Sequence, residues 1–306
     1  MSILSQKTIN KKISFSGIGL HTGINVEISL IPSAPNTGIV FKRIDIKQNN
    51  IIIPTFENVI DTTLCTTLSN ESGVKVSTIE HLMGALYGLG IDNLLVEVNA
   101  QELPILDGSA KIFIENILSV GIKYSSTPIK LIKIEKKVSY EEGSKKISLE
   151  KSKVSSEIDF EINYKNKFIG TQRNKVNIFN DDLKNIYESR TFCLYTDVEK
   201  LKKAGLAKGG SLDNAVVVGD DEILNEYGLR NSKEFVNHKI LDCMGDLYLS
   251  GYRIVGSLVT SEGGHGLTNK LLRKLFSDKS NFSVIEIKEK SLPYQILDRS
   301  YLKSTA

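Results

Sequence analysis

Histidine and carboxylate side chains occupy positions in this sequence from which they could hold a divalent metal ion. Between Asn231 and Ser250, His238, Asp242 and Asp246 recur at steps of four residues, and such positions stack on one face of an α-helix. The other residues of this helix are largely apolar, so an imidazole and two carboxylates are costly to bury there without a partner. A metal ion is the simplest partner. A solvated polar edge is the alternative, and this helix alone leaves both open.

A second helix would supply the next histidine. Ser77 and Glu80 have the Ser-x-x-Glu spacing of a capping box at the start of an apolar run. We therefore expect a helix from this point to about Gly88 or Gly90, since glycine commonly terminates helices. Glu80 needs no catalytic role if it only caps this helix, and His81 could simply be a polar residue near the helix start.

The side chains of His81, His238 and Asp242 would together form an open zinc set. Two histidines and one carboxylate leave one position free for water or substrate, although the same donors also suit Fe²⁺. Bound Zn²⁺ lowers the pKa of water to ~7, and Glu80 is placed to take the proton. Cys243 would point about 100° away from Asp242 around the helix, which favours an open site over a closed structural one.

A fourth histidine could complete the chemistry. His265 lies in the glycine-rich segment SEGGHG, and we expect a flexible loop from which it can reach into a cleft. Asp246 is one helical turn beyond Asp242, so it could contact His265 without being a metal ligand. A nearby carboxylate favours the imidazolium, which would suit His265 as a general acid.

The first half of the chain contains the strands that would position the second helix. Residues 13–15, 26–30 and 39–41 are rich in β-branched and apolar types, and 94–98 reads as a buried strand. The segment SGIGLHTG lies between the first two. Because another strand follows it, we interpret it as a hairpin or bulge and not as a nucleotide-binding loop. His21 in this segment could line a site, although a turn histidine is the commoner case.

The second half repeats this order of elements. Charged, alternating strands follow Pro128, then a strand, a short helix, a glycine turn and a strand, then the helix that carries His238. A strand at 252–259 and a helix at 267–276 complete it. KGGS lacks the G-x-x-x-x-G-K-[ST] pattern of a phosphate loop, so we interpret it as a turn. Two similar halves predict two domains, with a pocket where their equivalent helices meet.

Composition excludes several classes of protein. The 306 residues are 41% hydrophobic and 25% charged, which is typical of a globular protein. A formal net charge of +3 argues against a dedicated nucleic-acid binder. We find no stretch long and apolar enough for a membrane helix and no signal-peptide core in MSILSQKTINKK. Three scattered cysteines indicate reduced thiols, so we expect a cytoplasmic protein.

Seven ordered motifs resemble one enzyme family. They are SGIGLHTG, STIEHLMGAL, LPILDGSA, SRTFC, KGGSLDNAVVV, FVNHKILDCMGDL and EGGHGLTNKL. Their combination is similar to the UDP-3-O-acyl-N-acetylglucosamine deacetylases, the zinc enzymes of the committed step of lipid A synthesis. The likeness extends from Ile13 to about Leu271 without a large departure, so it is far more specific than any single motif.

The resemblance implies an α+β fold, a two-domain β-α-α-β sandwich. Each domain would be a mostly antiparallel sheet packed on helices, with the helices layered between the two sheets. The domains would be 1–126 and 127–306, with an insert near 194–218 that walls a hydrophobic passage for an acyl chain. It also implies one zinc ion per chain, held by His81, His238 and Asp242. Glu80 would be the general base, and His265 would be the acid with Asp246 as its partner.

The resemblance adds further residues to the site. Thr191 would hydrogen-bond the oxyanion, Lys239 would meet the diphosphate, and Phe192 would lie near the uridine. Cys65 would be a neighbour of the metal and not a ligand. The remaining positions expected at the sugar, in the acyl passage or along the site are Asp197, Val198, Ala207, Ser211, Ala215, Val217 and His21.

Two other functions compete with this interpretation. One is a zinc amidohydrolase for another N-acyl sugar or amino acid, which a long acyl passage would fit poorly. The other is a nucleotide- or lipid-binding protein with a structural metal, for which Glu80, Asp246 and His265 would be surplus. The expected partner is the UDP-3-O-acyl-N-acetylglucosamine substrate, with transient contact with the inner membrane face, no nucleic acid and no transmembrane segment. We expect a monomer.

Overall fold

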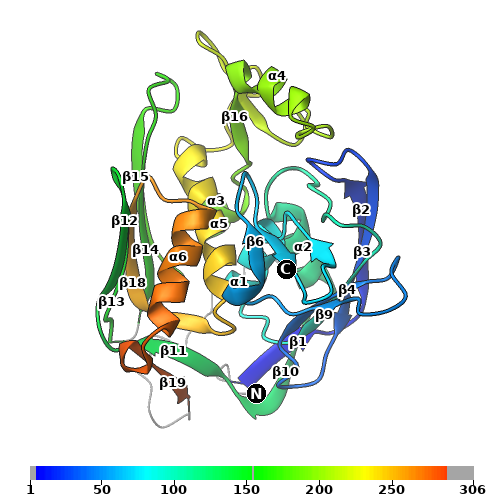
Figure 1. Cartoon of the computed structure of the whole chain (residues 1–306), viewed down its shortest axis with the longest axis vertical. Coiled ribbons are helices and arrows are strands. Elements are labelled where there is room, and N and C mark those ends of the chain that lie inside the picture. The colour runs from blue at the N-terminus through cyan, green and yellow to red at the C-terminus, as the bar shows by residue number, and fades with distance from the viewer. Residues whose placement is uncertain (1–4, 154, 288–306) are drawn as a thin grey trace.

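The computed structural model describes residues 5–153 and 155–287, which form a mixed α+β structure (Figure 1). The first part of the chain contains β1 (Ser5–Ile9), β2 (Ile13–Ile18), β3 (Asn25–Pro32), β4 (Ile39–Arg43), β5 (Ile51–Ile52), η1 (Phe56–Asn58), β6 (Val59–Asp61), β7 (Thr67–Ser69), β8 (Lys75–Val76), α1 (Glu80–Leu89), β9 (Leu94–Val98), α2 (Lys111–Val120) and β10 (Ile122–Pro128). These bounds confirm the strands and the helix that the sequence predicts there.

The second part contains β11 (Lys130–Ile134), β12 (Val138–Glu142), β13 (Lys145–Glu150), β14 (Ser156–Asn163), β15 (Thr171–Asn177), α3 (Lys184–Tyr187), β16 (Phe192–Leu194), α4 (Tyr195–Lys203), β17 (Val216–Val218), α5 (Glu234–Tyr248), β18 (Arg253–Ser261), α6 (His265–Phe276), η2 (Lys279–Asn281) and β19 (Phe282–Glu286). The predicted order of strand, short helix, glycine turn and strand is confirmed in β16, α4 and β17. No helix within the described ranges is both long and apolar enough to cross a membrane.

A five-stranded sheet forms one outer layer. Its strand order is β2-β3-β9-β4-β5, with β4 and β9 parallel and the other neighbours antiparallel. Along β3 the side chains of Val26, Ile28 and Leu30 are buried, whereas Glu27 between them is exposed. This period of two gives the sheet one apolar face, which packs on the core.

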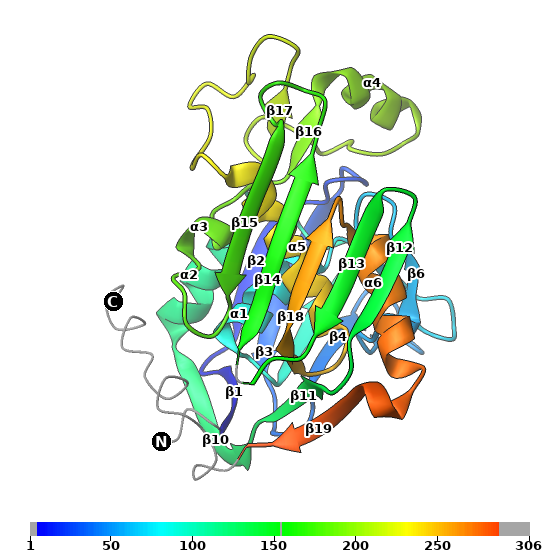
Figure 2. The same ribbon diagram turned by 90° about the vertical axis from the view of Figure 1, so that its left-hand side faces the viewer.

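A seven-stranded sheet forms the opposite outer layer. Strand β18 pairs with β13 in antiparallel fashion and with β14 and β11 in parallel fashion, and β12, β15 and β19 complete the sheet. Strand β14 alternates buried and half-buried residues along most of its length. Figures 1 and 2 show α1, α5 and α6 between this sheet and the five-stranded one.

Helices α1 and α5 pack together in the middle of the molecule. Glycines allow their backbones to approach closely: a Cβ atom on Gly245 would lie 2.2 Å from the carbonyl oxygen of Glu80, and one on Gly84 would lie 2.7 Å from Leu241 Cδ1. Real Cβ atoms do not approach other atoms so closely, so a larger residue at Gly245 would push the helices apart. This close packing brings residues of the two helices into one site.

The segment from Phe192 to Val218 projects beyond one end of the helical layer (Figure 1). Its two short strands, β16 and β17, pair in parallel fashion, and α4 between them has no buried residue. The backbone N–H groups of Lys208 and Gly209 donate to the carbonyl oxygens of His21 and Leu20. The glycine-rich segments SGIGLHTG and KGGS therefore contact each other.

Candidate metal centre

Three buried side chains from α1 and α5 converge on one point. One ligand atom each from His81, His238 and Asp242 lies within 4.8 Å of the other two. The Nε2 atoms of the two histidines lie 3.6 and 3.4 Å from Asp242 Oδ1. All three residues are at most 5% exposed. The structure thus brings together the three residues that the sequence selects as metal ligands.

The surrounding hydrogen bonds orient these donors. His238 Nδ1 lies 3.1 Å from the carbonyl oxygen of Ser189, so an Nδ1–H donates there and leaves the Nε2 lone pair free. Lys239 Nζ donates to Asp242 Oδ2 at 2.9 Å. Asp242 Oδ1 is buried and has no hydrogen-bond partner. A buried carboxylate oxygen is costly to leave unpaired, and a cation beside the two Nε2 atoms would satisfy it.

The ionisation of the three side chains also fits a metal. Burial lowers the pKa of His81, and it lowers the pKa of His238 to about 3, so both rings are neutral at pH 7. Burial alone would raise the pKa of Asp242, but His238 and Lys239 hold it well below its usual range. Two neutral imidazoles and one carboxylate are the protonation states that metal binding requires, and they suit Zn²⁺ with an open position.

Glu80 is the first residue of α1 and adjoins the candidate metal ligand His81 in the chain. Its Oε2 accepts a hydrogen bond from the backbone N–H of Thr66 at 3.1 Å, and burial raises its pKa to about 7. The predicted capping box is wrong: the N-cap residue is Ile79, and the Ser77 hydroxyl donates to the Gln101 carbonyl oxygen. The Glu80 carboxylate therefore faces the interior and does not cap its helix.

His265 and Asp246 form a buried pair beside the three ligands. His265 Nδ1 lies 2.8 Å from Asp246 Oδ2. Burial alone would lower the pKa of His265, but the Asp246 charge and this hydrogen bond raise it to about 9. The expected flexible loop is wrong, because His265 is the first residue of α6, two residues before the predicted start. The imidazole is held by its hydrogen bond to Asp246 on α5.

The residues expected to bind substrate surround this centre in part. The Phe192 ring lies 6.3 Å from the His238 ring and 5.8 Å from Lys239 Nζ. Thr191 is fixed through its backbone, since its N–H donates to the Gly108 carbonyl oxygen and its own carbonyl accepts from Val216 N–H. Thr191 is thereby held between the connection from β9 to α2 and strand β17.

The positions expected along the acyl passage differ in their exposure. Ala215 and Val217 are buried, Val198 and Ala207 are half-buried, and Ser211 is exposed. The half-buried Asp197 forms an ion pair with Lys200 at 3.1 Å. Val217 therefore lies on the fully buried strand β17, whereas Asp197 and Val198 lie on α4, which has no buried residue.

His21 and Cys65 are near neighbours of buried carboxylates. The backbone N–H of His21 donates to Glu102 Oε1, whereas its two ring nitrogens are buried without a hydrogen-bond partner. Burial raises the pKa of the Cys65 thiol to about 12, and the Glu80 charge adds to this. Cys65 is therefore a neutral thiol at pH 7.

Sequence reasoning missed Thr66, Ser189 and Glu102. Thr66 and Ser189 contact site residues, and Glu102 accepts hydrogen bonds from the His21 segment. Thr66 stands in a run of threonines, Ser189 acts through its carbonyl, and Glu102 is far from its partners in sequence. No spacing within the chain indicates such contacts.

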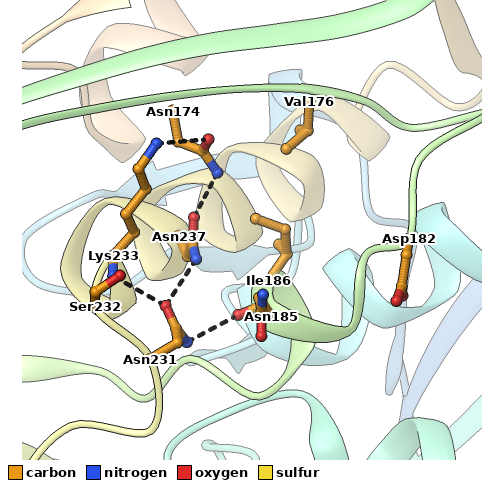
Figure 3. Close-up of a pocket in the computed structure, with 9 residues that line it drawn as sticks. All are labelled: Asn174, Val176, Asp182, Asn185, Ile186, Asn231, Ser232, Lys233 and Asn237. Atoms are coloured by element: carbon orange, nitrogen blue, oxygen red, sulfur yellow. Dashed lines mark hydrogen bonds between the residues drawn. The ribbon is translucent and has the colours of Figure 1, made fainter.

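A polar cavity of about 210 Å³ lies between β15, α3 and the N-terminal end of α5 (Figure 3). It is lined by Asn174, Val176, Asp182, Asn185, Ile186, Asn231, Ser232, Lys233 and Asn237. Its amides satisfy one another: Asn174 Nδ2 donates to Asn237 Oδ1, and Asn237 Nδ2 donates to Asn231 Oδ1. None of the predicted site residues lines this cavity.

Comparison with known proteins gives a consistent set of relatives. A family model described as LpxC, UDP-3-O-acyl N-acetylglycosamine deacetylase, matches residues 6–277. A protein of Histophilus somni named UDP-3-O-acyl-N-acetylglucosamine deacetylase is 42% identical over 292 residues, covering 94% of this chain and 95% of the relative. A protein of the same name from Haemophilus ducreyi is 42% identical, covering 92% of this chain and 94% of the relative. One from Pasteurella multocida is also 42% identical, covering 94% of this chain and 95% of the relative.

Proposed function

This chain belongs to the LpxC family of UDP-3-O-acyl N-acetylglycosamine deacetylases, and on that premise we propose that it hydrolyses UDP-3-O-acyl-N-acetylglucosamine. The products would be UDP-3-O-acyl-glucosamine and acetate, in the committed step of lipid A biosynthesis. One observation carries the proposal: the buried ligand set of His81, His238 and Asp242 is flanked by the Glu80 carboxylate and by the pair of His265 and Asp246. A structural metal site would need neither.

His81, His238 and Asp242 would hold one Zn²⁺ ion, and Fe²⁺ is the alternative for this donor set. When bound, the ion supplies Lewis-acid polarisation and lowers the pKa of water. The ligands come from two helices that pack through glycines, so their separation is fixed before the ion binds. Lys239 holds the second oxygen of Asp242 and carries its charge toward Phe192, where it would also meet the substrate diphosphate.

Glu80 would act as the general base. Its carboxylate is buried next to His81, and the Thr66 N–H fixes its Oε2 atom. It takes a proton from the attacking water as the water oxygen forms a bond to the acetyl carbonyl carbon. The Thr191 hydroxyl would stabilise the resulting tetrahedral oxyanion, as preorganised donors do in acyl transfer.

His265 would act as the general acid. Asp246 accepts from Nδ1, so the proton that His265 can deliver lies on Nε2. The bond between the carbonyl carbon and the sugar nitrogen breaks, and the nitrogen takes this proton. Acetic acid and the free 2-amino sugar leave, the acid loses its remaining proton to water to become acetate, and the proton held by Glu80 balances the one that His265 has given.

We also propose the domain organisation and the substrate-binding residues. A two-domain β-α-α-β sandwich with domains 1–126 and 127–306 is supported by the two sheets on opposite sides of the helices (Figures 1 and 2). The segment near 194–218 would wall the acyl passage in a cytoplasmic enzyme. The residues proposed to bind substrate there or nearby are Phe192, Asp197, Val198, Ala207, Ser211, Ala215, Val217 and His21.

The pH dependence of kcat should be bell-shaped. As pH rises through the pKa of Glu80, which burial raises to about 7, the base becomes available and the rate rises. As pH rises further through the pKa of His265, which Asp246 raises to about 9 against the effect of burial, the acid is lost and the rate falls. A bound cation would repel protons and lower both values.

His265→Ala tests the descending limb of this profile. We expect a lower kcat that no longer falls at high pH, measured as acetate release across the pH range. A descending limb that persists unchanged in the variant would show that another group donates the proton.

Acyl dependence tests the substrate. We expect the protein to release acetate from UDP-3-O-acyl-N-acetylglucosamine and to be much slower with UDP-N-acetylglucosamine, because only the acylated sugar can use the passage. Equal kcat/KM for the two compounds would instead support a general N-acyl amidohydrolase. The comparison uses one preparation of enzyme, so metal content is the same in both assays.

A further inference from the structure

One buried threonine contacts both halves of the proposed acid–base machinery. Thr66 is 1% exposed and lies in the segment just before β7. Its backbone N–H donates to Glu80 Oε2 at 3.1 Å, and its hydroxyl donates to Asp246 Oδ1 at 2.6 Å. We propose that Thr66 is a positioning residue for deacetylation, which fixes the base through its backbone and the partner of the acid through its side chain. The inference rests on the proposed function.

The hydroxyl of Thr66 completes the hydrogen bonding of the Asp246 carboxylate. Asp246 is 3% exposed, and its Oδ2 is occupied by His265 Nδ1. Without the Thr66 hydroxyl, the charged Oδ1 atom would lose this hydrogen bond in a buried position. Hydrogen bonds to an ionised acceptor are short and strong. With both oxygens held, the carboxylate plane is fixed, and so is the direction in which His265 presents Nε2.

The backbone that carries Thr66 is itself constrained. Leu64, two residues earlier, has a φ of 66° in the left-handed region, which is costly for a residue with a side chain. Strained backbone persists where the surrounding structure over-determines it, and it clusters at functional sites. Strand β7 follows directly and pairs with β6 and β8. The backbone is therefore constrained on both sides of Thr66, by the left-handed residue before it and by the paired strand after it.

The Thr66→Val variant tests the role of the hydroxyl group separately from that of the backbone N–H. Valine keeps the branched shape and the N–H to Glu80 but removes the hydroxyl. We expect kcat to fall by about 10–100-fold, as for partners that orient active groups, with KM and zinc content unchanged. Thr66→Ser should restore most of the lost kcat, because it returns the hydroxyl. Thr67→Val is the matched control: Thr67 is half-buried and its hydroxyl lies 3.8 Å from Cys65 Sγ, so kcat should not change.

A spectroscopic measurement makes the test independent of turnover. In metal-free protein with ¹⁵N-labelled histidine, the Nδ1 proton of His265 should give a downfield NMR signal that is absent in His265→Ala. Thr66→Val should shift or broaden this signal, and Thr67→Val should not. If the valine variant does not fold, Thr66→Ala serves the same comparison.

Two results would overturn the inference. One is a Thr66→Val enzyme with wild-type kcat and an unchanged His265 signal. The other is a loss that appears in KM or zinc content and is not restored by serine. If wild-type protein releases no acetate, the proposed function fails, whereas the NMR comparison still decides whether Thr66 orients Asp246 and His265.

Discussion

The Glu80→Gln variant should bind its metal and lose about 10²–10⁴-fold in kcat, the usual contribution of a positioned acid or base. Glutamine has nearly the same shape, and its carbonyl oxygen can still accept from the Thr66 N–H that holds Oε2. It cannot accept a proton at neutral pH. The loss should therefore appear in kcat and not in metal content, with acetate release and zinc per chain measured on the same samples.

A half-buried glutamate on the five-stranded sheet supplies the control for this experiment. Glu97 lies on β9, where it forms an ion pair with Lys42 at 3.2 Å, and Glu97→Gln should leave kcat unchanged. The ascending limb of the pH profile should also disappear in Glu80→Gln, because the pKa of the base is then removed from the rate. A zinc-loaded Glu80→Gln enzyme with wild-type kcat would exclude Glu80 as the base.

The second large effect concerns the metal itself. Asp242→Asn removes the negative charge of a carboxylate whose Oδ1 is buried without a hydrogen-bond partner and whose Oδ2 accepts from Lys239. Changes to residues around a metal cost about 10–100-fold in affinity, and loss of an anionic ligand should cost more. We expect the variant to lose zinc on dialysis under conditions in which the wild type retains it, and to lose activity with it.

Asp246→Asn is the matched control, since it makes the same change one helical turn away. Asp246 hydrogen-bonds to His265 and Thr66, whereas Asp242 lies beside His81 and His238, the two proposed histidine ligands. This variant should keep its zinc but turn over slowly, because His265 loses the charge that raises its pKa. Zinc loss in Asp246→Asn with retention in Asp242→Asn would exchange the roles assigned to these two residues.

The sequence predicts the metal ligands because helix periodicity is a local property. His238 and Asp242 are four residues apart, so their shared face follows from helix geometry, and α5 confirms the helix. His81 is far away in sequence. Its approach to them depends on α1 and α5 packing through Gly84 and Gly245, which only the structure reveals.

The two incorrect predictions, the capping box at Glu80 and the flexible loop at His265, have a common cause. Ser77 and Glu80 fit a capping pattern, and the glycines before His265 fit a loop, because both patterns consider only neighbours in the chain. In the structure the carboxylate of Glu80 is held by Thr66, and His265 is held by Asp246 from another helix. Tertiary hydrogen bonds thus determine both side chains, and at functional sites they commonly override local preference.

The contribution of Thr66 could not be predicted from the sequence for a related reason. Its two hydrogen bonds connect residues 14 and 180 positions away along the chain. Neither periodicity nor a short motif encodes such a contact. The same holds for Ser189, whose carbonyl oxygen orients His238 whatever its side chain is.

Acetate release from UDP-3-O-acyl-N-acetylglucosamine, followed through removal and return of the metal, tests the central claim most directly. Purified protein is assayed as isolated, after chelation, and after addition of one equivalent of Zn²⁺, with circular dichroism recorded at each stage. We predict that activity disappears on chelation and returns with zinc while the spectrum stays constant. A folded, zinc-loaded protein that releases no acetate would contradict the deacetylase function, and a protein that unfolds on chelation would indicate a structural metal.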